Sequence, residues 1–267
     1  MSPSRRQVSL AALAAVPLAL AATGTAHAAA PGRRSRTLHI AGDSTAARKY
    51  ADAAPETGWG TALPFFLHRH LDVANHAVNG RSSKSFVDEG RLEAVLSVIR
   101  PGDLLLVQFA HNDEKATDPS RYTEPWSTYR QYLRLYVDGA RARGARPVLA
   151  TAVERRRFDA DGAAVPTHGE YPEAMRALAR QEGVALLDVQ ALSLALWQEL
   201  GVEETKKYFN WTPAEQDNTH FNPPGAIAVA RLVARELLRT RVLAPRDVRR
   251  LDEDVPESWI TWPQATA

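Results

Sequence analysis

The 267-residue chain contains no cysteine, which excludes disulfide bonds and metal sites with thiolate ligands. After the N-terminal segment, no stretch approaches the roughly 18 consecutive apolar residues of a membrane-spanning helix. The formal net charge is only +2, and Arg5 and Arg6 account for all of it. Without a basic stripe, nucleic acid is not an expected partner. The histidines, including His111 and His168, show no metal-ligand spacing, so we expect neither a metal nor a cofactor.

The first 28 residues have the pattern of an export signal. Arg5 and Arg6 precede an apolar stretch from Val8 to Ala22, and Ala26-His27-Ala28 fits the small-x-small cleavage rule. The run Ser-Arg-Arg-Gln-Val over residues 4–8 also resembles a twin-arginine signal, which would export a folded protein. We therefore expect a cleaved signal over residues 1–28, a secreted protein without membrane attachment, and a single domain over residues 29–267.

Short apolar runs alternate along the chain with longer helical patterns, which is typical of an α/β fold with a parallel sheet covered on both faces. The predicted strands are Thr37 to Ala41, Asp72 to Ala77, Asp103 to Phe109, Pro147 to Val153 and Ala185 to Asp188. The predicted helices are Gly60 to His70, Arg91 to Ile99, Thr128 to Arg143, Tyr171 to Glu182, Val189 to Leu200 and Pro224 to Leu238. The proline-containing tail after Val242 is expected to be a strap across the surface.

Three of these strands are followed within a few positions by Ser44, Gly80 and Asn112. Ligands of such sheets bind at the carboxyl ends of the strands, so these three residues should gather on one rim. Residues 122–125 and 206–216, the second of which contains Trp211, are predicted to be loops over the same edge.

Asp217 and His220, in the run DNTHFNPPG, can complete a nucleophilic site with Ser44. A serine hydroxyl needs a base to take its proton, and that base needs a third group to orient it. The oxyanion formed by attack on a carbonyl needs fixed donors, for which the N–H groups of Ser44 and Gly80 and the Asn112 amide are candidates. A glycine also lets the backbone approach the reacting centre closely.

Each of these residues has a structural reading when taken alone. Ser44 could be a helix N-cap, the Asp-x-x-His pair could cap the following helix, and Asn112 could be a turn residue. Asn79-Gly80 is a strong turn dipeptide, and this is compatible with an oxyanion role. Asp113 and Glu114 are interpreted as turn residues or helix-start acids.

Substrate contacts are harder to predict. Arg81 and the run Arg155-Arg156-Arg157 could recognise carboxylates, although such arginines more often form structural ion pairs. Among the tryptophans, Trp211 is the candidate for stacking on a sugar, whereas Trp59 and Trp126 are candidates for the core.

Four blocks taken together, GDST, NHAVNGRSSKSF, AHNDEK and DNTHFN, resemble the SGNH hydrolase superfamily. Within it, the chain from about Leu38 to Leu237 is similar to the rhamnogalacturonan acetylesterase family, which deacetylates pectic polysaccharide. The resemblance implies a three-layer α/β/α, flavodoxin-like fold with a five-stranded parallel sheet. It also implies Ser44 as nucleophile, His220 as base, Asp217 as orienting acid, and an oxyanion hole of Ser44, Gly80 and Asn112.

One residue departs from the family pattern, because Ala110 stands where a glycine usually precedes the His-Asn-Asp of the third block. We interpret this added methyl group as a change that adjusts the geometry of the site without loss of activity. Ser44 lacks the G-x-S-x-G elbow of ordinary α/β-hydrolases. The expected partner is an acetylated polysaccharide, most specifically rhamnogalacturonan, bound by a monomer. Acetylated xylan, small acetyl esters and longer acyl esters remain alternative substrates, and a non-catalytic carbohydrate-binding protein remains a different class.

Overall fold

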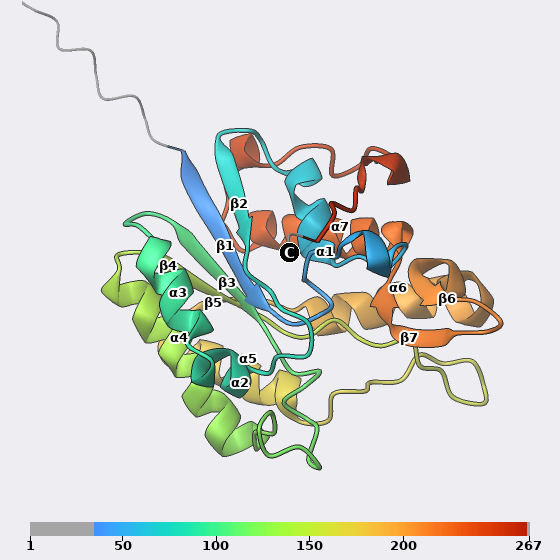
Figure 1. Cartoon of the computed structure of the whole chain (residues 1–267), viewed down its shortest axis with the longest axis horizontal. Helices are drawn as coiled ribbons and strands as arrows, with labels where there is room; N and C mark the ends of the chain where they lie inside the picture. Colours follow the sequence, from blue (N-terminus) through green and yellow to red (C-terminus); the bar gives the residue numbers. More distant parts are fainter. Residues whose placement is uncertain (1–34, 266–267) are drawn as a thin grey trace, which may run out of the picture. The chain divides into compact units, whose positions relative to one another are not determined.

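Five parallel strands form the central sheet of the computed structural model, which describes residues 35–265, in the order β2-β1-β3-β4-β5 (Figure 1). The strands are β1 (Arg36–Gly42), β2 (Leu71–Asn75), β3 (Leu104–Gln108), β4 (Arg146–Ala150) and β5 (Ala185–Leu187). In the register, Leu38 of β1 lies opposite Val73 on one side and Leu104 on the other. The α/β class and the five-stranded parallel sheet are therefore confirmed. The predicted signal over residues 1–28 lies outside the described residues.

Helices cover both faces of this sheet (Figure 1). One face carries α2 (Ser83–Asp88), α3 (Arg91–Val98), α4 (Arg130–Ala142) and α5 (Tyr171–Glu182). The other carries α1 (Trp59–Ala62), α6 (Val189–Glu204) and α7 (Pro223–Arg239). Short turns of 3-10 helix are η1 (Ala51–Ala53), η2 (Leu63–Phe66), η4 (Thr205–Tyr208), η5 (Pro245–Asp247) and η6 (Glu257–Trp259), and η3 (Pro125–Tyr129) is a π-helical turn before α4.

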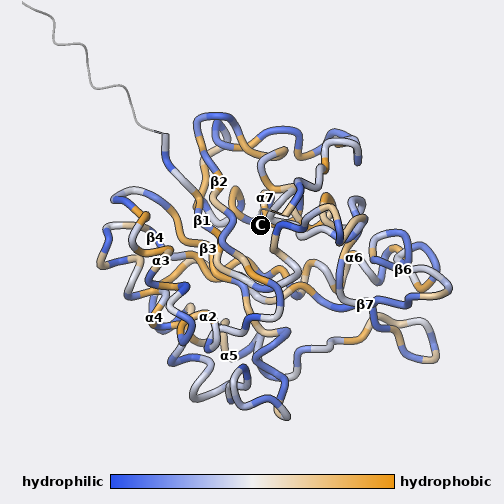
Figure 2. Tube along the Cα trace, in the orientation of Figure 1, coloured by the Kyte–Doolittle hydropathy of each residue, from blue (hydrophilic) through white to orange (hydrophobic). Residues whose placement is uncertain are grey.

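The core is divided by the sheet because successive side chains of a strand point to opposite faces. Ile40 of β1 packs in the cluster beneath α1, α6 and α7, and its neighbour Ala41 packs in the cluster beneath α2–α5. The β3 segment is fully buried and lies among the hydrophobic segments at the centre of Figure 2. None of the helices within residues 35–265 is long and apolar enough to cross a bilayer.

Two helix predictions need correction. The helix predicted from Gly60 to His70 is instead α1 followed by η2, because Pro64 has no N–H to continue an α-helix. The start of the Thr128 helix falls inside the π-helical turn, so α4 begins at Arg130. The predicted end of α6 at Leu200 agrees with a break at Gly201, whose φ is +74°.

Four further elements were not predicted: η4, β6 (Phe209–Trp211), β7 (Gln216–Phe221) and α2. The segment expected to be a loop over residues 206–216 contains η4 and strand β6. Strand β6 pairs antiparallel with β7, so Trp211 lies in a strand opposite Gln216 rather than in a loop. Helix α2 was also missed; it begins with a capping box between Ser82 and Ser85.

Candidate active site

Ser44 lies in the tight turn that follows β1. The N–H groups of Ala46 and Ala47 both donate to the carbonyl of Asp43, at 3.2 and 3.0 Å, so the chain makes one helical turn directly after the strand. This turn holds the Ser44 hydroxyl 2.9 Å from Nε2 of His220, which is 176 residues further along the chain. The structure therefore brings together the two side chains predicted to be nucleophile and base.

His220 and Asp217 both belong to β7, so one strand fixes their mutual geometry. Nδ1 of His220 donates to Oδ2 of Asp217 at 2.8 Å, and Oδ1 of Asp217 accepts from the N–H groups of Thr219 and His220. Burial alone would raise the pKa of Asp217, but the bonds from His220 and Thr219 outweigh it and lower the pKa. An ionised Asp217 requires the proton on Nδ1, which leaves Nε2 free to accept from Ser44.

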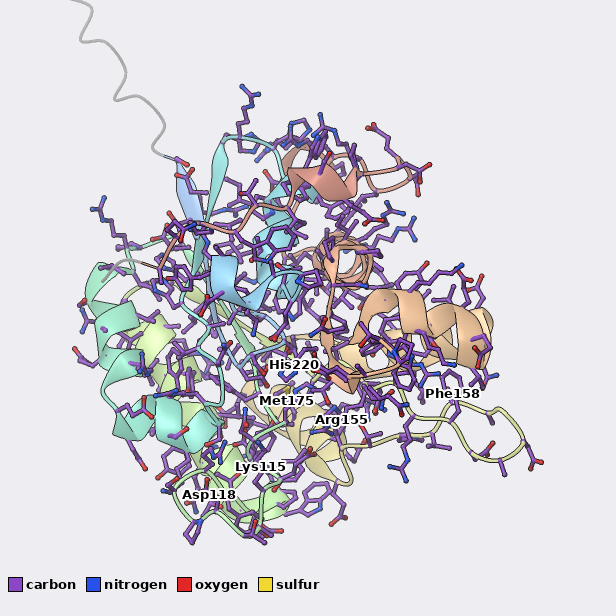
Figure 3. The ribbon with its side chains drawn as sticks, turned by 45° about the vertical axis from the view of Figure 1, so that its right-hand side comes forward. Lys115, Asp118, Arg155, Phe158, Met175 and His220 are labelled. Carbon is purple, nitrogen blue, oxygen red and sulfur yellow. The ribbon has the colours of Figure 1, made fainter. Side chains whose placement is uncertain are left out.

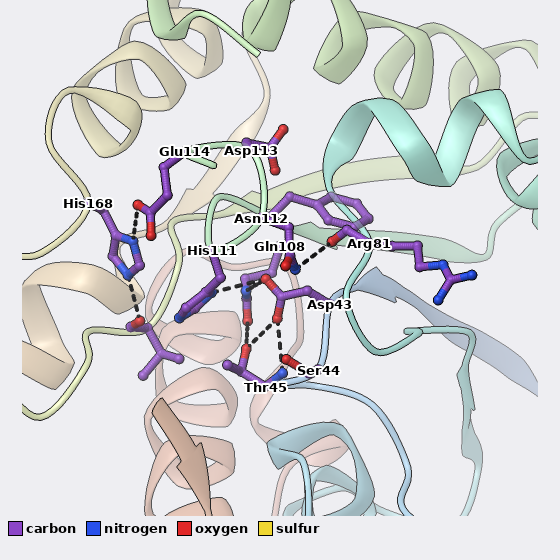
Figure 4. Close-up of polar contacts among 12 residues, drawn as sticks. Asp43, Ser44, Thr45, Arg81, Gln108, His111, Asn112, Asp113, Glu114 and His168 are labelled. Atoms are coloured by element: carbon purple, nitrogen blue, oxygen red, sulfur yellow. Dashed lines mark hydrogen bonds and ion pairs between the residues drawn. The ribbon is translucent and has the colours of Figure 1, made fainter. Parts of the chain in front are cut away.

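The Gly80 loop and the Asn112 loop meet where Asn112 bonds to Arg81, which follows Gly80 (Figure 4). Nδ2 of Asn112 donates to the carbonyl of Arg81 at 3.1 Å, and its second hydrogen remains for another acceptor. Gly80 has φ of +75°, a conformation that favours glycine. Nη1 of Arg121 lies 3.5 Å from both the carbonyl of Gly80 and Oδ1 of Asn112, which links the two candidate oxyanion donors.

A buried network supports the nucleophile turn from behind (Figure 4). Asp43 accepts from Nδ1 of His111 at 3.0 Å and from the N–H and hydroxyl of Thr45. Burial alone would raise the pKa of Asp43, yet His111 and Thr45 lower it to about 2. Burial lowers the pKa of His111, so its neutral ring donates to the Asp43 carboxylate at neutral pH. The network joins the end of β1 to the loop after β3.

Asp113 joins the two candidate oxyanion loops. Its carboxyl group accepts from the N–H and hydroxyl of Ser83, which begins α2, and from the hydroxyl of Thr123. Burial raises the pKa of Asp113 to about 7 and outweighs these hydrogen bonds, which lower it. Asp113 lies in a turn after β3, as interpreted, and its carboxyl group caps the start of α2, but its partners lie 10 and 30 residues away in the sequence.

Four side chains predicted to contact substrate also have protein partners, namely Arg81, Arg155, Arg156 and Trp211, whereas Arg157 is exposed and its side chain forms no hydrogen bond or ion pair within residues 35–265. Arg81 pairs with both carboxylate oxygens of Glu89, at 3.1 and 3.0 Å. Arg155, labelled below His220 in Figure 3, pairs with Glu114. The Arg156 guanidinium bonds to Thr205 and Asn218 and lies 4.7 Å from the Trp211 ring centroid. Arg81 and Trp211 therefore each have a local protein partner, and their contact with substrate stays a prediction.

Sequence reasoning missed Lys49, which connects the nucleophile segment to the Gly80 loop. Its Nζ donates to Oδ1 of Asn79 at 2.6 Å and pairs with Glu56 at the same distance. The side chain is only 1% exposed, which is rare for lysine and requires such pairing. Its position five residues after Ser44 was the only feature of the sequence that could have indicated this role.

The chain was compared with known families and structures. The model of the GDSL-like lipase/acylhydrolase family matches residues 40–226, which include all four motif blocks. The chain belongs to this family. Within residues 35–265 of this GDSL-like hydrolase, no group of three or more His, Asp or Glu side chains could hold a metal ion.

Relatives narrow the chemistry to that of carboxylic ester hydrolases. The chain is 44% identical over 198 residues to the probable rhamnogalacturonan acetylesterase YesY of Bacillus subtilis, covering 74% of this chain and 90% of that protein. It is 45% identical over 206 residues to the rhamnogalacturonan acetylesterase RhgT of the same organism, covering 74% and 87%. The predicted resemblance is confirmed, and this GDSL-like hydrolase is an ester hydrolase.

Solved structures confirm the fold. The crystal structure of YxiM from Bacillus subtilis has 31% identity and a TM-score of 0.70, over 78% of this chain and 57% of that one. The acetylxylan esterase Axe2 of Geobacillus stearothermophilus has 16% identity and a TM-score of 0.55, over 78% and 95%. At that identity, the likeness to Axe2 supports the fold alone.

Proposed function

We propose that this protein is a serine esterase that removes O-acetyl groups from acetylated rhamnogalacturonan. The observation that carries the proposal is the continuous hydrogen-bonded chain from Ser44 through His220 to Asp217, with distances of 2.9 and 2.8 Å. The substrate rests on the 44–45% identity to the Bacillus rhamnogalacturonan acetylesterases.

The first half of the reaction forms an acetyl-enzyme. Oγ of Ser44 attacks the acetyl carbonyl carbon while Nε2 of His220 takes the hydroxyl proton. Asp217 stabilises the resulting imidazolium through its bond to Nδ1. The oxyanion receives hydrogen bonds from the N–H groups of Ser44 and Gly80 and from the Asn112 amide. When the intermediate collapses, the sugar oxygen leaves and takes the proton from Nε2.

The second half regenerates the enzyme. A water molecule gives a proton to Nε2 of His220, and its oxygen attacks the acetyl carbon bound to Ser44. The new tetrahedral intermediate uses the same donors, and its collapse returns the proton to Oγ and releases acetic acid, which loses its remaining proton to water and becomes acetate. His220 thus carries the proton in both transfers of each half-reaction.

Acetate release tests the proposal directly. The protein from Ala29 onward should release acetate faster from acetylated rhamnogalacturonan than from acetylated xylan, and it should also cleave an aryl acetate. Ser44→Ala should reduce all three activities by at least about 10³-fold. Wild-type activity on xylan or the aryl acetate alone would retain the mechanism and reject the substrate. Activity that survives Ser44→Ala would reject the mechanism.

We further propose that the protein is exported and that residues 1–28 are removed to leave a monomeric single domain. This rests on the basic, apolar and small-x-small pattern of the first 28 residues. The N-terminal sequence and sedimentation mass of the protein from culture medium test it, with Ala29 and a monomer expected. Replacement of Arg5 and Arg6 by lysine should block export if the twin-arginine route is used and should have little effect otherwise.

A further inference from the structure

A cavity of about 600 Å³ lies between the segment that follows Ser44 and the segment that precedes Gly80. Its walls come from residues 47–53, from α1 and η2, and from residues 73–79. The helical turn after β1 keeps Arg48, in this wall, within about 10 Å of Ser44 along the chain. The size is typical of small-ligand sites, which span about 300–1,000 Å³. The cavity therefore borders both loops that carry candidate catalytic groups.

The wall nearest the catalytic loops is rigid because of Lys49. Its buried ammonium group bridges Asn79 of the Gly80 loop and Glu56 beside η1, at 2.6 Å each. Glu56 balances this charge, so Lys49 is a structural link rather than a cation available to a ligand.

Arg48, unlike Lys49, is a cation that can bind a ligand. It lines the cavity and is exposed, and it forms no hydrogen bond or ion pair through its side chain with any residue in the described part of the chain. By contrast, Arg121 beside the oxyanion loops is paired with Asp118 at 2.5 Å. The cavity lining thus presents a guanidinium group that has no ion-pair partner among the described residues.

Two other side chains give the cavity the character of a sugar site. Tyr50 is 41% exposed and offers a ring face against which a sugar can lie. Asp52 lines the same cavity without forming an ion pair with Arg48, and its carboxylate can accept hydrogen bonds from hydroxyl groups.

We propose that this cavity binds a sugar of the acetylated polysaccharide and that Arg48 pairs with the carboxylate of a uronate unit. A guanidinium group matches a carboxylate with two parallel hydrogen bonds, which a neutral sugar cannot accept in the same way. This inference rests on the proposed function, and it assigns recognition of the acidic unit to Arg48 rather than to Arg81 or Arg155.

The test is a two-by-two comparison of kcat/KM. Wild type and Arg48→Gln are assayed on acetylated rhamnogalacturonan and on the same polymer with its carboxylates reduced to alcohols. The substitution should lower kcat/KM on the native polymer about tenfold, mainly through KM, because the lost bonds are charge-assisted. Wild type should lose a similar factor on the reduced polymer, and Arg48→Gln should lose nothing further there.

Two more variants sharpen the comparison. Arg69→Gln is the matched control, because Arg69 is exposed without side-chain partners among the described residues but lies at the amino end of β2, opposite the catalytic rim. It should match wild type. Arg48→Lys keeps the charge without the planar fork and should fall between wild type and Arg48→Gln. If Arg48→Gln unfolds, Arg48→Lys alone still decides the point, because its deficit must vanish on the reduced polymer.

The outcomes separate the two proposals. An active wild type with no loss in Arg48→Gln, or with a loss that persists on the reduced polymer, would overturn the Arg48 inference and leave the esterase function intact. A wild type that cleaves aryl acetate but releases no acetate from either form of the pectic polymer would overturn the proposed substrate, and the uronate subsite with it.

Discussion

Two buried carboxyl groups near the site, Asp43 and Asp113, differ in pKa by about five units because their partners differ. The Asp43 carboxylate accepts from the His111 ring as well as from Thr45, and its pKa falls to about 2. Asp113 accepts only from Ser83 and Thr123, which do not overcome burial, and its pKa rises to about 7. Asp43 thus supports folding as an anion, whereas Asp113 resists ionisation.

This difference predicts how stability changes with pH. Below about pH 4, Asp113 is protonated in both the folded and the unfolded state. Between pH 4 and pH 7 it ionises only when unfolded, so the folded state loses up to about 4 kcal/mol relative to the unfolded state. Asp113→Asn cannot ionise and should escape this loss. Its free energy of unfolding relative to wild type, measured in urea, should therefore rise between pH 4 and pH 7.

The control for this prediction is Asp161→Asn, an exposed carboxylate to which no hydrogen bond or ion pair is assigned within residues 35–265. Its unfolding free energy should stay parallel to wild type across the same range. Asp43→Asn should show the opposite dependence, since the low pKa of Asp43 stabilises the folded state above about pH 4 and that contribution disappears as pH falls toward 2. Parallel curves for Asp113→Asn and wild type would show that Asp113 ionises in the folded protein as readily as in the unfolded one.

Asn112→Ala tests the oxyanion assignment. The amide is fixed by its bond to the Arg81 carbonyl, so its second hydrogen is already oriented before substrate binds. Its loss should lower kcat on an aryl acetate about 10²- to 10³-fold with little change in KM, because the bond strengthens only as charge develops. Steady-state kinetics measures this effect, and Ser44→Ala gives the residual rate of the protein without its nucleophile. A change confined to KM would assign Asn112 to substrate binding instead.

At the level of single residues, the sequence was informative where the chemistry restricts residue type. Ser44, Asp217 and His220 could be named because few arrangements supply a nucleophile, an acid and a base in this order. The ion-pair partner of Arg81 could not be predicted, since it depends on whether Glu89 lies within reach in the fold. A charged residue has many possible partners, and only the structure selects one.

At the level of elements, long periodic segments were predictable and short ones were not. Helices α5 and α7 have an apolar face that repeats over several turns, which fixed their position in the sequence. The three-residue strand β6 and the six-residue helix α2 are too short to show a period. Their stability comes from tertiary contacts, such as the pairing of β6 with the strand that carries His220.

Gly58→Ala tests how closely helix α1 packs against the nucleophile turn. A Cβ at Gly58 would lie 2.3 Å from the carbonyl oxygen of Ala47 and 2.4 Å from the carbonyl carbon of Ala46, so backbone would have to move. The clash should cost about 3 kcal/mol of stability and shift Ser44 enough to reduce kcat at least about tenfold. Urea unfolding and aryl acetate kinetics measure the two effects.

The matched control is Gly139→Ala in the middle of α4. There the new Cβ would meet the flexible end of Leu96 at 2.6 Å, on the far side of the sheet from α1. The gain in helix propensity, about 1 kcal/mol, offsets that contact, and activity should equal wild type. Equal stability and equal kcat for Gly58→Ala and Gly139→Ala would show that the α1 contact does not position the nucleophile.

At the scale of the whole molecule, the C-terminal tail reaches back to the first catalytic segment. Nε1 of Trp262 donates to the carbonyl of Glu56 at 2.7 Å, and the carbonyl of Pro263 accepts from the N–H of Ala51 at 3.0 Å. The prediction of a surface strap from the prolines of the tail did not specify where it would attach. Contacts across 206 residues depend on how the intervening domain folds, and local composition does not encode them.

This attachment predicts a long-range effect on substrate binding. Glu56 is held by Trp262 through its backbone and holds Lys49 through its side chain, and Lys49 in turn holds the Gly80 loop through Asn79. Trp262→Ala should therefore loosen residues 51–56, raise KM for acetylated rhamnogalacturonan several-fold, and lower the melting temperature by about 2–8 °C through the loss of roughly 1–2 kcal/mol. Trp259→Ala is the control, because Trp259 is 40% exposed and packs on Phe65 rather than on this segment. Since the two variants remove the same side chain from the same tail, an equal rise in KM would mean that general loosening of the tail, and not the hold on Glu56, shapes the site.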